Sequence, residues 1–589
     1  MSNTSELPQT MQGLFSLAVE RHADRVALRQ RGPGGWRATT YAEMAETVQA
    51  TALGLVDLGL ACGERVALLC TTRQEWTFAS FAVSLAGGVV VPIYPTSSAQ
   101  ECEWVLSDSG AVAVICEDGS QVDKVLAVRA RLARLPTVLT VEPVAGLRSL
   151  DEIARQCAGA DHSELDRRAD VVRGVDPYTI IYTSGTTGPP KGCILSHDNL
   201  RAVLGAVVEH HLLSEPDDVT YLYLPLAHAL ALIMQLSCFA VGGAITYAGG
   251  DPRQILAELG EVAPTFLPSV PRIFEKVYAA ATRDLDPVIL REAVRVGGAV
   301  EDLRRCGAPI PTELRDAYSE FDTGLFGRVR AAFGGRLRLA VTGAAPIAPE
   351  ILELFWASGV PVMEGYGMTE TASAISICTL AAHRFGTVGR PVPGVEVRIA
   401  EDGEILVRGA NVFQGYHDAA EGAVGTRNNG WLHTGDLGSL DADGFLSITG
   451  RKKDIIITAG GKNLTPANLE NDLKQSPWIS HALMHGDRRP YPIMLITLDE
   501  EEMSRWAEKR GIPGDLRSLA QSAVVRELVQ AELDRANAKY ARVEQAKRFL
   551  ILDHDLSQQA GELTPTLKVK RDVVNQKYAS LIDQLYAHS

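Results

Sequence analysis

Helix and strand patterns alternate between residues 40 and 180, and this alternation limits the possible fold more than any other feature of the sequence. Helical spacing of apolar residues covers Tyr41–Leu60 and Trp76–Ala86. Short, continuously apolar runs of strand type occupy Val66–Cys70, Val89–Ile93 and Ala111–Cys116. Such runs are typical of strands buried on both faces. The alternation therefore predicts an α/β fold of mostly parallel sheets with helices on both faces.

A different pattern begins near residue 395. Val395–Ile399, Gly403–Arg408 and Gly444–Thr449 are short strand patterns separated by Asp/Gly turns, which is typical of antiparallel pairing. The charged segment Gly450–Asp454 follows them. We place a domain boundary in this segment, which divides the chain into residues 1–452 and 453–589.

The region after this boundary has helix and strand patterns of its own. Helices are expected at Pro466–Gln475 and Leu516–Glu544, and strands at Ile493–Leu498 and Phe549–Leu552. These elements suffice for a small α+β domain. A chain of 589 residues is also long enough for two or more domains.

The composition is that of a globular protein with an acidic balance. Hydrophobic residues make up 46% and charged residues 22%, and 57 basic against 72 acidic residues give a net charge of −15. This charge gives no reason to expect nucleic-acid binding. Residues 221–250 contain no charged side chain, a run long enough to cross a bilayer. Pro225, His228 and Gln235 interrupt it, so we assign it to the buried core.

Signals for a cellular compartment are few. The N-terminus lacks the basic segment and apolar core of a secretion signal. The nine cysteines include no CxxC pair, which argues against a zinc or redox motif, and an odd number fits a reducing cytoplasm. We expect a cytoplasmic protein. Peripheral contact with the inner membrane face, and the choice between a monomer and a homodimer, stay open.

The strongest local signal is the segment Ile181–Gly192, IYTSGTTGPPKG, which follows the strand pattern Tyr178–Tyr182. Glycines let backbone N–H groups approach an anion, and the hydroxyl groups and Lys191 complete a cradle for phosphate. It is not a Walker A loop, because Lys191 stands between Pro190 and a glycine instead of before Ser or Thr. The alternative is a flexible surface loop, which seldom combines these features.

This segment resembles the phosphate-loop signature of the adenylate-forming (AMP-binding) superfamily. Other segments resemble that family's motifs in the family's order; they are Tyr223–His228, Gly343–Pro346, Glu364–Glu370, Trp431–Asp436 with Gly450 and Arg451, and Leu563–Arg571. Three more resemble the long-chain fatty acyl-CoA synthetase branch; they are Val91–Thr96, Pro264–Lys276, and Gly460–Asn463 with Gly486–Pro490. The resemblance spans about residues 15–580. It implies two α/β subdomains, a small β-barrel and a mobile α+β C-terminal domain.

The resemblance also implies an ATP-dependent, AMP-forming ligase that joins a long-chain fatty acid to coenzyme A. A carboxylate is a poor electrophile, so its oxygen first attacks the α-phosphorus of ATP and pyrophosphate leaves. The thiol of coenzyme A then displaces AMP. Because the first two reactants are both anions, we expect positioning and cationic stabilisation to dominate catalysis. The substrates would be fatty acid, ATP and coenzyme A, with Mg²⁺ as the metal.

Individual roles follow from the resemblance, position by position. Lys568, His228 and Glu370 would be catalytic, with Lys568 on the carboxylate and α-phosphate and Lys570 as its rival. Glu370 and Thr183 would bind Mg²⁺, which prefers oxygen ligands. The full ATP/AMP-binding set is Thr183, Ser184, Gly185, Thr186, Thr187, Gly188, Lys191, Gly343, Ala344, Ala345, Glu364, Gly365, Tyr366, Gly367, Met368, Thr369, Asp436, Arg451 and Lys568.

The second half-reaction would need a rotation of the C-terminal domain about a hinge at Lys453. Rotation would bring Gly460, Gly461 and Lys462 to the acyl-adenylate, where glycines suit the close approach of a thin pantetheine arm. Two alternatives remain. One is a fatty acyl-AMP ligase that loads an acyl carrier protein, and the other is an acyl- or nucleotide-binding protein without turnover.

Overall fold

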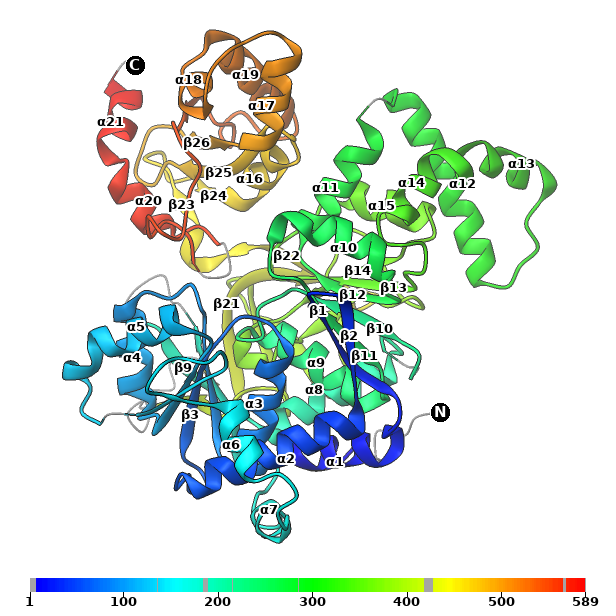
Figure 1. Cartoon of the computed structure of the whole chain (residues 1–589). Helices are drawn as coiled ribbons and strands as arrows, with labels where there is room; N and C mark the ends of the chain where they lie inside the picture. The colour runs from blue at the N-terminus through cyan, green and yellow to red at the C-terminus, as the bar shows by residue number, and fades with distance from the viewer. Residues whose placement is uncertain are drawn as a thin grey trace.

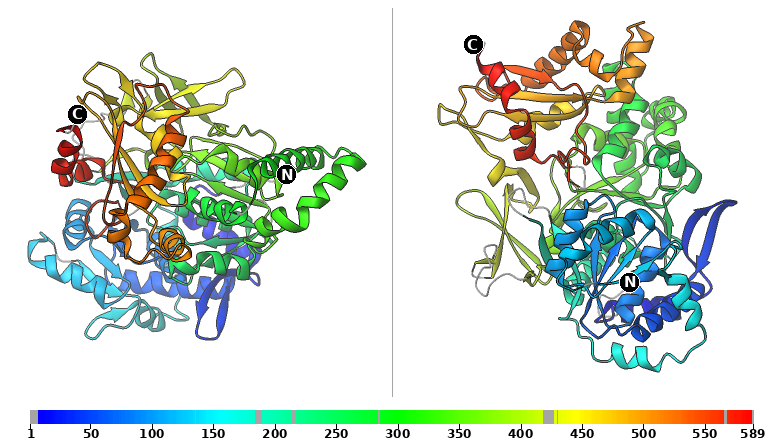
Figure 2. Two further views of the ribbon diagram at one scale, coloured as in Figure 1. Left: turned by 90° about the horizontal axis from the view of Figure 1, so that it is seen from above. Right: turned by 60° about the vertical axis from the view of Figure 1, so that its left-hand side comes forward.

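The chain forms a large N-terminal part of stacked sheets and helices, and a smaller C-terminal part that packs on it (Figures 1 and 2). The structure, a computed structural model, describes residues 7–134, 136–183, 189–213, 216–283, 285–417, 427–428, 430–564 and 568–587.

Two large, mostly parallel sheets organise the N-terminal part. The eight-stranded sheet has the order β19-β9-β8-β4-β3-β5-β6-β7, from β19 (Gly415–Tyr416), β9 (Lys191–Ser196), β8 (Pro177–Thr183), β4 (Val89–Ile93), β3 (Arg65–Leu69), β5 (Ala113–Cys116), β6 (Thr137–Thr140) and β7 (Arg148–Ser149). The nine-stranded sheet has the order β16-β15-β14-β13-β12-β10-β11-β1-β2, from β16 (Arg390–Pro391), β15 (Ser376–Ile377), β14 (Val362–Tyr366), β13 (Leu339–Thr342), β12 (Phe266–Ser269), β10 (Val219–Leu222), β11 (Ala244–Tyr247), β1 (Val26–Gly32) and β2 (Gly35–Thr40).

Helices form three layers, one between the two sheets and one on the outer face of each sheet, and the side chains of each strand alternate between two of these layers. In β3, Val66 and Leu68 join the core between the sheets, whereas Ala67 and Leu69 face the outer core. The central layer contains α1 (Met11–His22), α2 (Tyr41–Asp57), α3 (Gln74–Leu85), α6 (Leu150–Gln156), α7 (Ser163–Ala169), α8 (His197–Glu209) and α9 (Ala229–Val241). The outer layers are α4 (Ala99–Ser109) and α5 (Gly119–Val128) on one side, and α10 (Ile255–Val262), α11 (Pro271–Thr282), α12 (Pro287–Arg305), α13 (Thr312–Phe321), α14 (Gly327–Ala331) and α15 (Pro349–Ala357) on the other.

The expected small β-barrel is an open antiparallel sheet in the described residues. It consists of β17 (Val395–Ile399), β18 (Glu404–Gly409), β20 (Arg427–Asn428), β21 (Trp431–Leu440) and β22 (Leu446–Arg451). The long strand β21 pairs with β18, β20 and β22, and its pairing with β22 has a register shift between Leu437 and Gly438. The described strands at the two ends of the sheet do not pair with each other.

The C-terminal part is built around the three-stranded sheet β25-β26-β27. Met494 and Ile496 of β26 face one group of helices, and Ile493 and Leu495 face the other. The elements are β23 (Ile456–Ile457), β24 (Asn463–Leu464), α16 (Pro466–Lys474), β25 (Ile479–His485), β26 (Ile493–Leu498), α17 (Glu500–Lys509), α18 (Leu516–Ala520), α19 (Ala523–Asn537), β27 (Arg548–Ile551), α20 (Arg571–Lys577) and α21 (Ala579–Ala587). The domain boundary between residues 452 and 453 stays a prediction.

Two regions show how well the sequence patterns located the elements. The uncharged run 221–250 forms α9 between β10 and β11 in the buried core. None of the helices in the described part of the chain is long and apolar enough to cross a membrane. The helix expected at Leu516–Glu544 is instead two helices, α18 and α19. The second ends at Asn537, whose side chain bonds the backbone of Ala546 and so turns the chain toward β27.

Candidate functional site

The Gly/Thr-rich motif lies in a hairpin between two strands. β8 and β9 are antiparallel, and Thr183 pairs with Lys191 at the base of their connection. The Thr183 hydroxyl donates to the backbone oxygen of Lys191 at 3.5 Å, and the Lys191 side chain is exposed. Ser184, Gly185, Thr186, Thr187 and Gly188 lie outside the described residues, so their contacts with phosphate stay predictions.

Two further motif segments follow the carboxyl ends of the parallel strands β13 and β14. In the segment after β13, Ala344 has a φ of +67°, a left-handed conformation that is uncommon for a residue with a side chain. After β14, a Cβ atom added to Gly367 would lie 1.9 Å from the backbone oxygen of Ser373, so only glycine fits there. Carboxyl ends of parallel strands are the usual ligand-binding edge of an α/β sheet.

Glu364, in the middle of β14, is only 7% exposed. Burial raises the pKa of its carboxyl group to about 8, although a hydrogen bond from the Ile347 backbone N–H opposes this shift. The group is therefore mostly uncharged at neutral pH, and an uncharged carboxyl group can donate a hydrogen bond.

Glu370 is held by a tyrosine from another sheet. It lies on the short 3₁₀ helix Thr369–Thr371 and is buried, and its Oε1 accepts a hydrogen bond of 2.7 Å from the Tyr416 hydroxyl group. The Lys191 ammonium lies 5.2 Å from the centre of the Tyr416 ring, a cation–π contact. Tyr416 thus joins the lysine of the hairpin to the carboxylate of Glu370.

Asp436 lies on a strand and not in a turn. β21 and β22 place it directly opposite Arg451, whose Nε donates to its Oδ1 at 2.9 Å. The Tyr366 hydroxyl group donates to its Oδ2 at 2.7 Å. These two bonds fix the orientation of the Asp436 carboxylate. Each of its oxygens can still accept a second hydrogen bond from a ligand.

His228 caps the N-terminus of α9. Its Nδ1 accepts the Leu230 backbone N–H at 3.3 Å, so in the neutral ring the proton sits on Nε2. Burial, and secondarily the charge of Lys568, lower the pKa of His228 to about 4. The imidazole is therefore neutral at physiological pH, with an N–H donor available at Nε2.

Lys568 approaches these groups from the far end of the chain. Its backbone N–H donates to the Thr564 hydroxyl oxygen at 3.0 Å, and the Thr564 N–H donates back to its carbonyl oxygen at 2.8 Å, which closes the turn that carries it. Solvent reaches part of the Lys568 side chain. Desolvation by the surrounding protein, and secondarily the positive charge of Arg451, nevertheless lower the pKa of Lys568, while the negative charges of Asp436 and Glu370 act in the opposite direction. Lys570, the rival, lies 3.9 Å from Glu101 instead.

The predicted hinge and thiol-site residues lie at the start of the C-terminal part. Lys453 belongs to the 3₁₀ helix Lys452–Asp454, and burial followed by the charge of Arg451 lowers its pKa. Gly460, Gly461 and Lys462 lie in a turn closed by the hydrogen bond from Thr458 N–H to the Lys462 oxygen, 3.0 Å. Among the described residues, the hydrogen bonds of this turn stay within the C-terminal part.

Sequence reasoning missed two residues of this site. Tyr416 is 46 positions from Glu370, so no spacing rule could pair them. Glu404 is buried and accepts hydrogen bonds from the Gly435 N–H at 2.9 Å and from Lys452 at 3.2 Å, which ties the residue before Asp436 in β21 to the residue before the predicted hinge. The sequence feature that could have pointed to Glu404 is its position as an acidic residue in an otherwise apolar strand pattern, GEILV.

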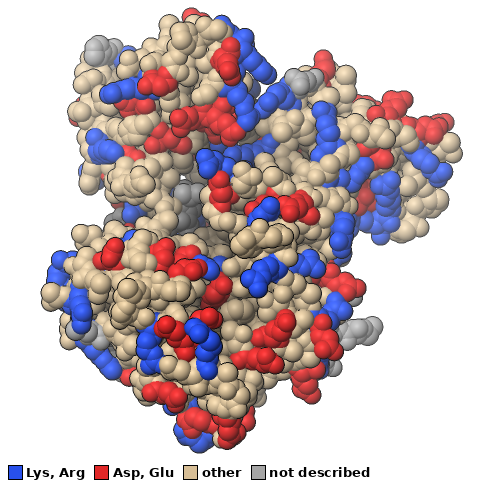
Figure 3. All heavy atoms as spheres, in the orientation of Figure 1, with Lys and Arg blue, Asp and Glu red and all other residues tan. Residues whose placement is uncertain are grey.

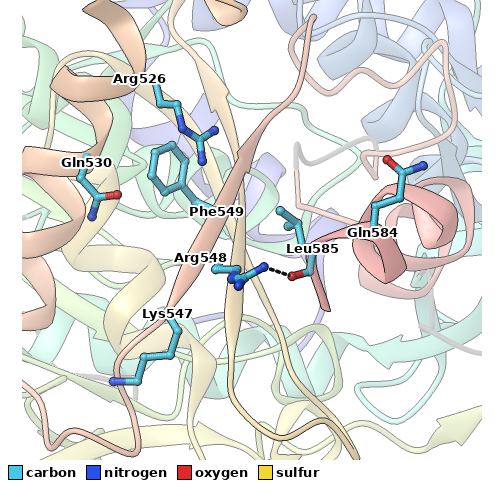
Figure 4. A pocket seen from close by; sticks show the side chains of 7 residues that line it. All are labelled: Arg526, Gln530, Lys547, Arg548, Phe549, Gln584 and Leu585. Atoms are coloured by element: carbon cyan, nitrogen blue, oxygen red, sulfur yellow. Dashed lines mark hydrogen bonds between the residues drawn. The ribbon is translucent and has the colours of Figure 1, made fainter. Parts of the chain in front are cut away.

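A separate pocket of about 260 Å³ opens on the C-terminal part (Figure 4). It is lined by Arg526, Gln530, Lys547, Arg548, Phe549, Gln584 and Leu585, none of which belongs to the predicted site. Its cations are already engaged: Arg548 donates to the Leu585 oxygen at 2.6 Å, Lys547 donates to the Arg542 oxygen at 2.6 Å, and the Arg526 guanidinium lies over Phe549. We assign it no part in the chemistry.

Comparison with known proteins shows the family to which the chain belongs. Residues 15–417 match the family described as AMP-binding enzyme, and residues 453–589 match the AMP-binding enzyme C-terminal domain. The long-chain-fatty-acid–CoA ligase FadD15 of Mycobacterium tuberculosis is 39% identical, over 96% of this chain and 94% of that protein. The long-chain-fatty-acid–CoA ligase ACSBG2 of Xenopus laevis is 32% identical, over 98% and 84%.

Among solved structures, the anthranilate CoA ligase AuaEII in complex with anthranoyl-AMP has the same fold. Its TM-score is 0.73 over 98% of this chain and 99% of that one, at 20% sequence identity. The two matched regions cover most of the sequence, and the relatives cover nearly all of it. The chain therefore belongs to the AMP-binding enzyme family, in the branch that contains the long-chain-fatty-acid–CoA ligases.

Proposed function

We propose that the protein is an ATP-dependent long-chain fatty acyl-CoA ligase that works through an acyl-adenylate. The observation that carries this proposal is that Lys568, from the C-terminal part, lies within electrostatic range of groups from the N-terminal part, which together define what we call the cleft: His228, Glu370, Asp436 and Arg451. The identity to the mycobacterial and frog ligases supports coenzyme A, and not a carrier protein, as the acceptor.

In the adenylation step, Lys568 would sit between the incoming carboxylate and the α-phosphate. Its ammonium is a compact, mobile point charge, suited to offsetting two approaching anions. The Nε2–H of His228 would donate to an oxygen of the same carboxylate and hold it for in-line attack. Because His228 is neutral, it adds a donor without repelling Lys568.

Nucleotide recognition would use the groups around the strand ends. Asp436, held by Tyr366 and Arg451, would accept the ribose hydroxyl groups. The segments Gly343–Ala345 and Glu364–Thr369 would enclose the base, and the hairpin after Thr183 would hold the phosphates with Lys191.

Magnesium fits the donor set at Glu370. The described residues include no group of three or more His, Cys, Asp or Glu side chains that could hold a metal ion. One oriented carboxylate and the Thr183 hydroxyl group suit an ion that takes most of its ligands from phosphates and water. When bound, Mg²⁺ would neutralise charge on the phosphate oxygens.

Thioester formation would follow a rotation about Lys453 that withdraws Lys568 and brings Gly460, Gly461 and Lys462 to the acyl-adenylate. We infer a rotation because this turn and Lys568 lie on the same C-terminal part, and among the described residues the hydrogen bonds of the turn stay within that part. We also place the protein in the cytoplasm, with peripheral contact at the inner membrane face. Its nine free thiols support a reducing compartment.

The test measures pyrophosphate release and CoA-thioester formation with saturated acids from acetate to about eighteen carbons. Chain length is varied because each CH₂ group buried by the protein adds to the binding free energy of the acid. Wild type is compared with Lys568→Ala. We expect the thioester to accumulate best with long chains and the variant to lose pyrophosphate release. Pyrophosphate without thioester would reject coenzyme A as acceptor. No pyrophosphate with any acid would reject the ligase.

A further inference from the structure

Two arginines join the N-terminal part to the C-terminal part next to α11 and α17. Arg272, in the first turn of α11, forms a short ion pair with Asp499. Arg283, which follows α11, contacts both carboxylate oxygens of Glu502 at 3.0 and 3.1 Å. Acidic and basic side chains gather where the C-terminal part meets the lobe that carries α11 (Figure 3).

A third contact lies on the other side of the C-terminal part. Lys570 approaches Glu101 of α4 at 3.9 Å, and it is only two residues from Lys568. In Figure 1, α4 lies at the left and α11 at the upper right, so the two contacts are far apart along the C-terminal part. The C-terminal part is therefore held at two separated places while Lys568 is in the cleft.

The α11–α17 contacts add little that either part needs for its own folding. Asp499 already caps α17, because its Oδ1 accepts the Glu502 N–H at 3.1 Å. Glu502 already pairs with Arg505 of the same helix at 3.0 Å. Arg272 also lies 4.0 Å from Glu275 of α11, a weak pair within the helix, but a positive charge in the first turn opposes the helix dipole, so its net gain for α11 is small. What these arginines add is a link between the parts.

We propose that Arg272 and Arg283 are positioning residues that hold the C-terminal part with Lys568 in the cleft, and so favour adenylation over thioester formation. This inference rests on the proposed function and on the proposed hinge. It also gives a role to the segment Pro264–Lys276, which contains Arg272 and resembles the long-chain branch.

The size of the effect follows from exposure. The two arginine side chains are 39% and 42% exposed and their partners 15% and 24%, so each link is a partly screened ion pair. Such pairs are weak one by one, and together they should bias the two arrangements by about 2- to 30-fold. High salt should weaken this bias, because partly exposed charges are screened.

The experiment combines Asp499→Asn with Arg283→Gln. Asparagine caps helices as well as aspartate does, so α17 should remain intact. Arg505→Gln is the matched control, because it removes an ion pair of Glu502 that stays within α17. Acid-dependent ATP–pyrophosphate exchange reports adenylation. Thioester formation from purified acyl-adenylate and coenzyme A reports the second half-reaction, and thermal unfolding reports folding.

We expect the double variant to lose about 2- to 30-fold in exchange and to keep or gain rate in thioester formation. Half-molar salt should reduce exchange in the wild type toward the level of the variant, while Arg505→Gln behaves like wild type. Unchanged exchange, or equal losses in both half-reactions, would overturn the inference. If the wild type itself shows no exchange, the proposed function fails and this inference with it.

Discussion

Removing the hydroxyl group of Tyr416 tests whether this residue holds Glu370 for catalysis. In Tyr416→Phe, the ring stays in place for Lys191, and only the 2.7 Å hydrogen bond to Oε1 is lost. Hydrogen bonds to charged groups contribute about 1.5–3 kcal/mol, and Glu370 is too buried for water to replace the donor fully. If this energy is used in the reaction, the rate of pyrophosphate release should fall by about 10- to 100-fold.

The assay is acid-dependent pyrophosphate release over a series of Mg²⁺ concentrations. A misplaced Glu370 should raise the Mg²⁺ concentration needed for half-maximal rate, which a general loss of folded protein would not do. Tyr416→Leu, which also removes the cation–π contact, should lose a further factor of about 2 to 30. Tyr221→Phe is the control, because it breaks a similar 2.6 Å bond to Glu258 among residues outside the predicted site.

The reasoning would be refuted if Tyr416→Phe kept both the wild-type rate and the wild-type Mg²⁺ dependence. It would also fail if Tyr221→Phe lost as much activity as Tyr416→Phe at equal thermal stability. In either case Tyr416 would contribute only to packing, and the backbone alone would orient Glu370.

Three other changes have expected outcomes. Asp436→Asn should raise the KM for ATP about 10-fold or more while the KM for the acid stays constant, measured by steady-state kinetics, because a charged ribose acceptor is lost. For Glu364, the folded pKa of about 8 exceeds the ordinary 4.5, so stability falls as pH rises between these values, by up to about 1.4 kcal/mol per pH unit. Denaturant unfolding at pH 6 and 8.5 should show this loss in wild type and not in Glu364→Gln; equal pH dependence would contradict the assignment. Gly367→Ala should lower the unfolding free energy by about 1–3 kcal/mol through overlap with Ser373, whereas Gly298→Ala, in open space within α12, should not destabilise the protein.

The sequence by itself determined the fold class and the kinds of groups at the site. The continuously apolar run Val89–Ile93 matched its strand to the residue, and the runs Val66–Cys70 and Ala111–Cys116 found β3 and β5 with bounds that differ by one or two residues, because burial on both faces leaves an apolar run as the pattern of a parallel strand. The resemblance of strand and loop motifs to a known family also singled out Asp436, Arg451 and Lys568, whose roles stay predictions. The patterns failed where a few residues interrupt a helix, as in the expected helix Leu516–Glu544, which is divided into α18 and α19.

Only the tertiary structure decided which of these groups meet. Tyr416 reaches Glu370, Tyr366 reaches Asp436, and Lys568 comes within electrostatic range of His228 across 340 residues of chain. The low pKa of His228 and the raised pKa of Glu364 also arise from burial, which has no local signature in a sequence. The links from Arg272 and Arg283 to α17 depend on how two separately packed parts are placed. Periodicity describes how one segment packs, whereas contacts between distant segments exist only once the chain is folded.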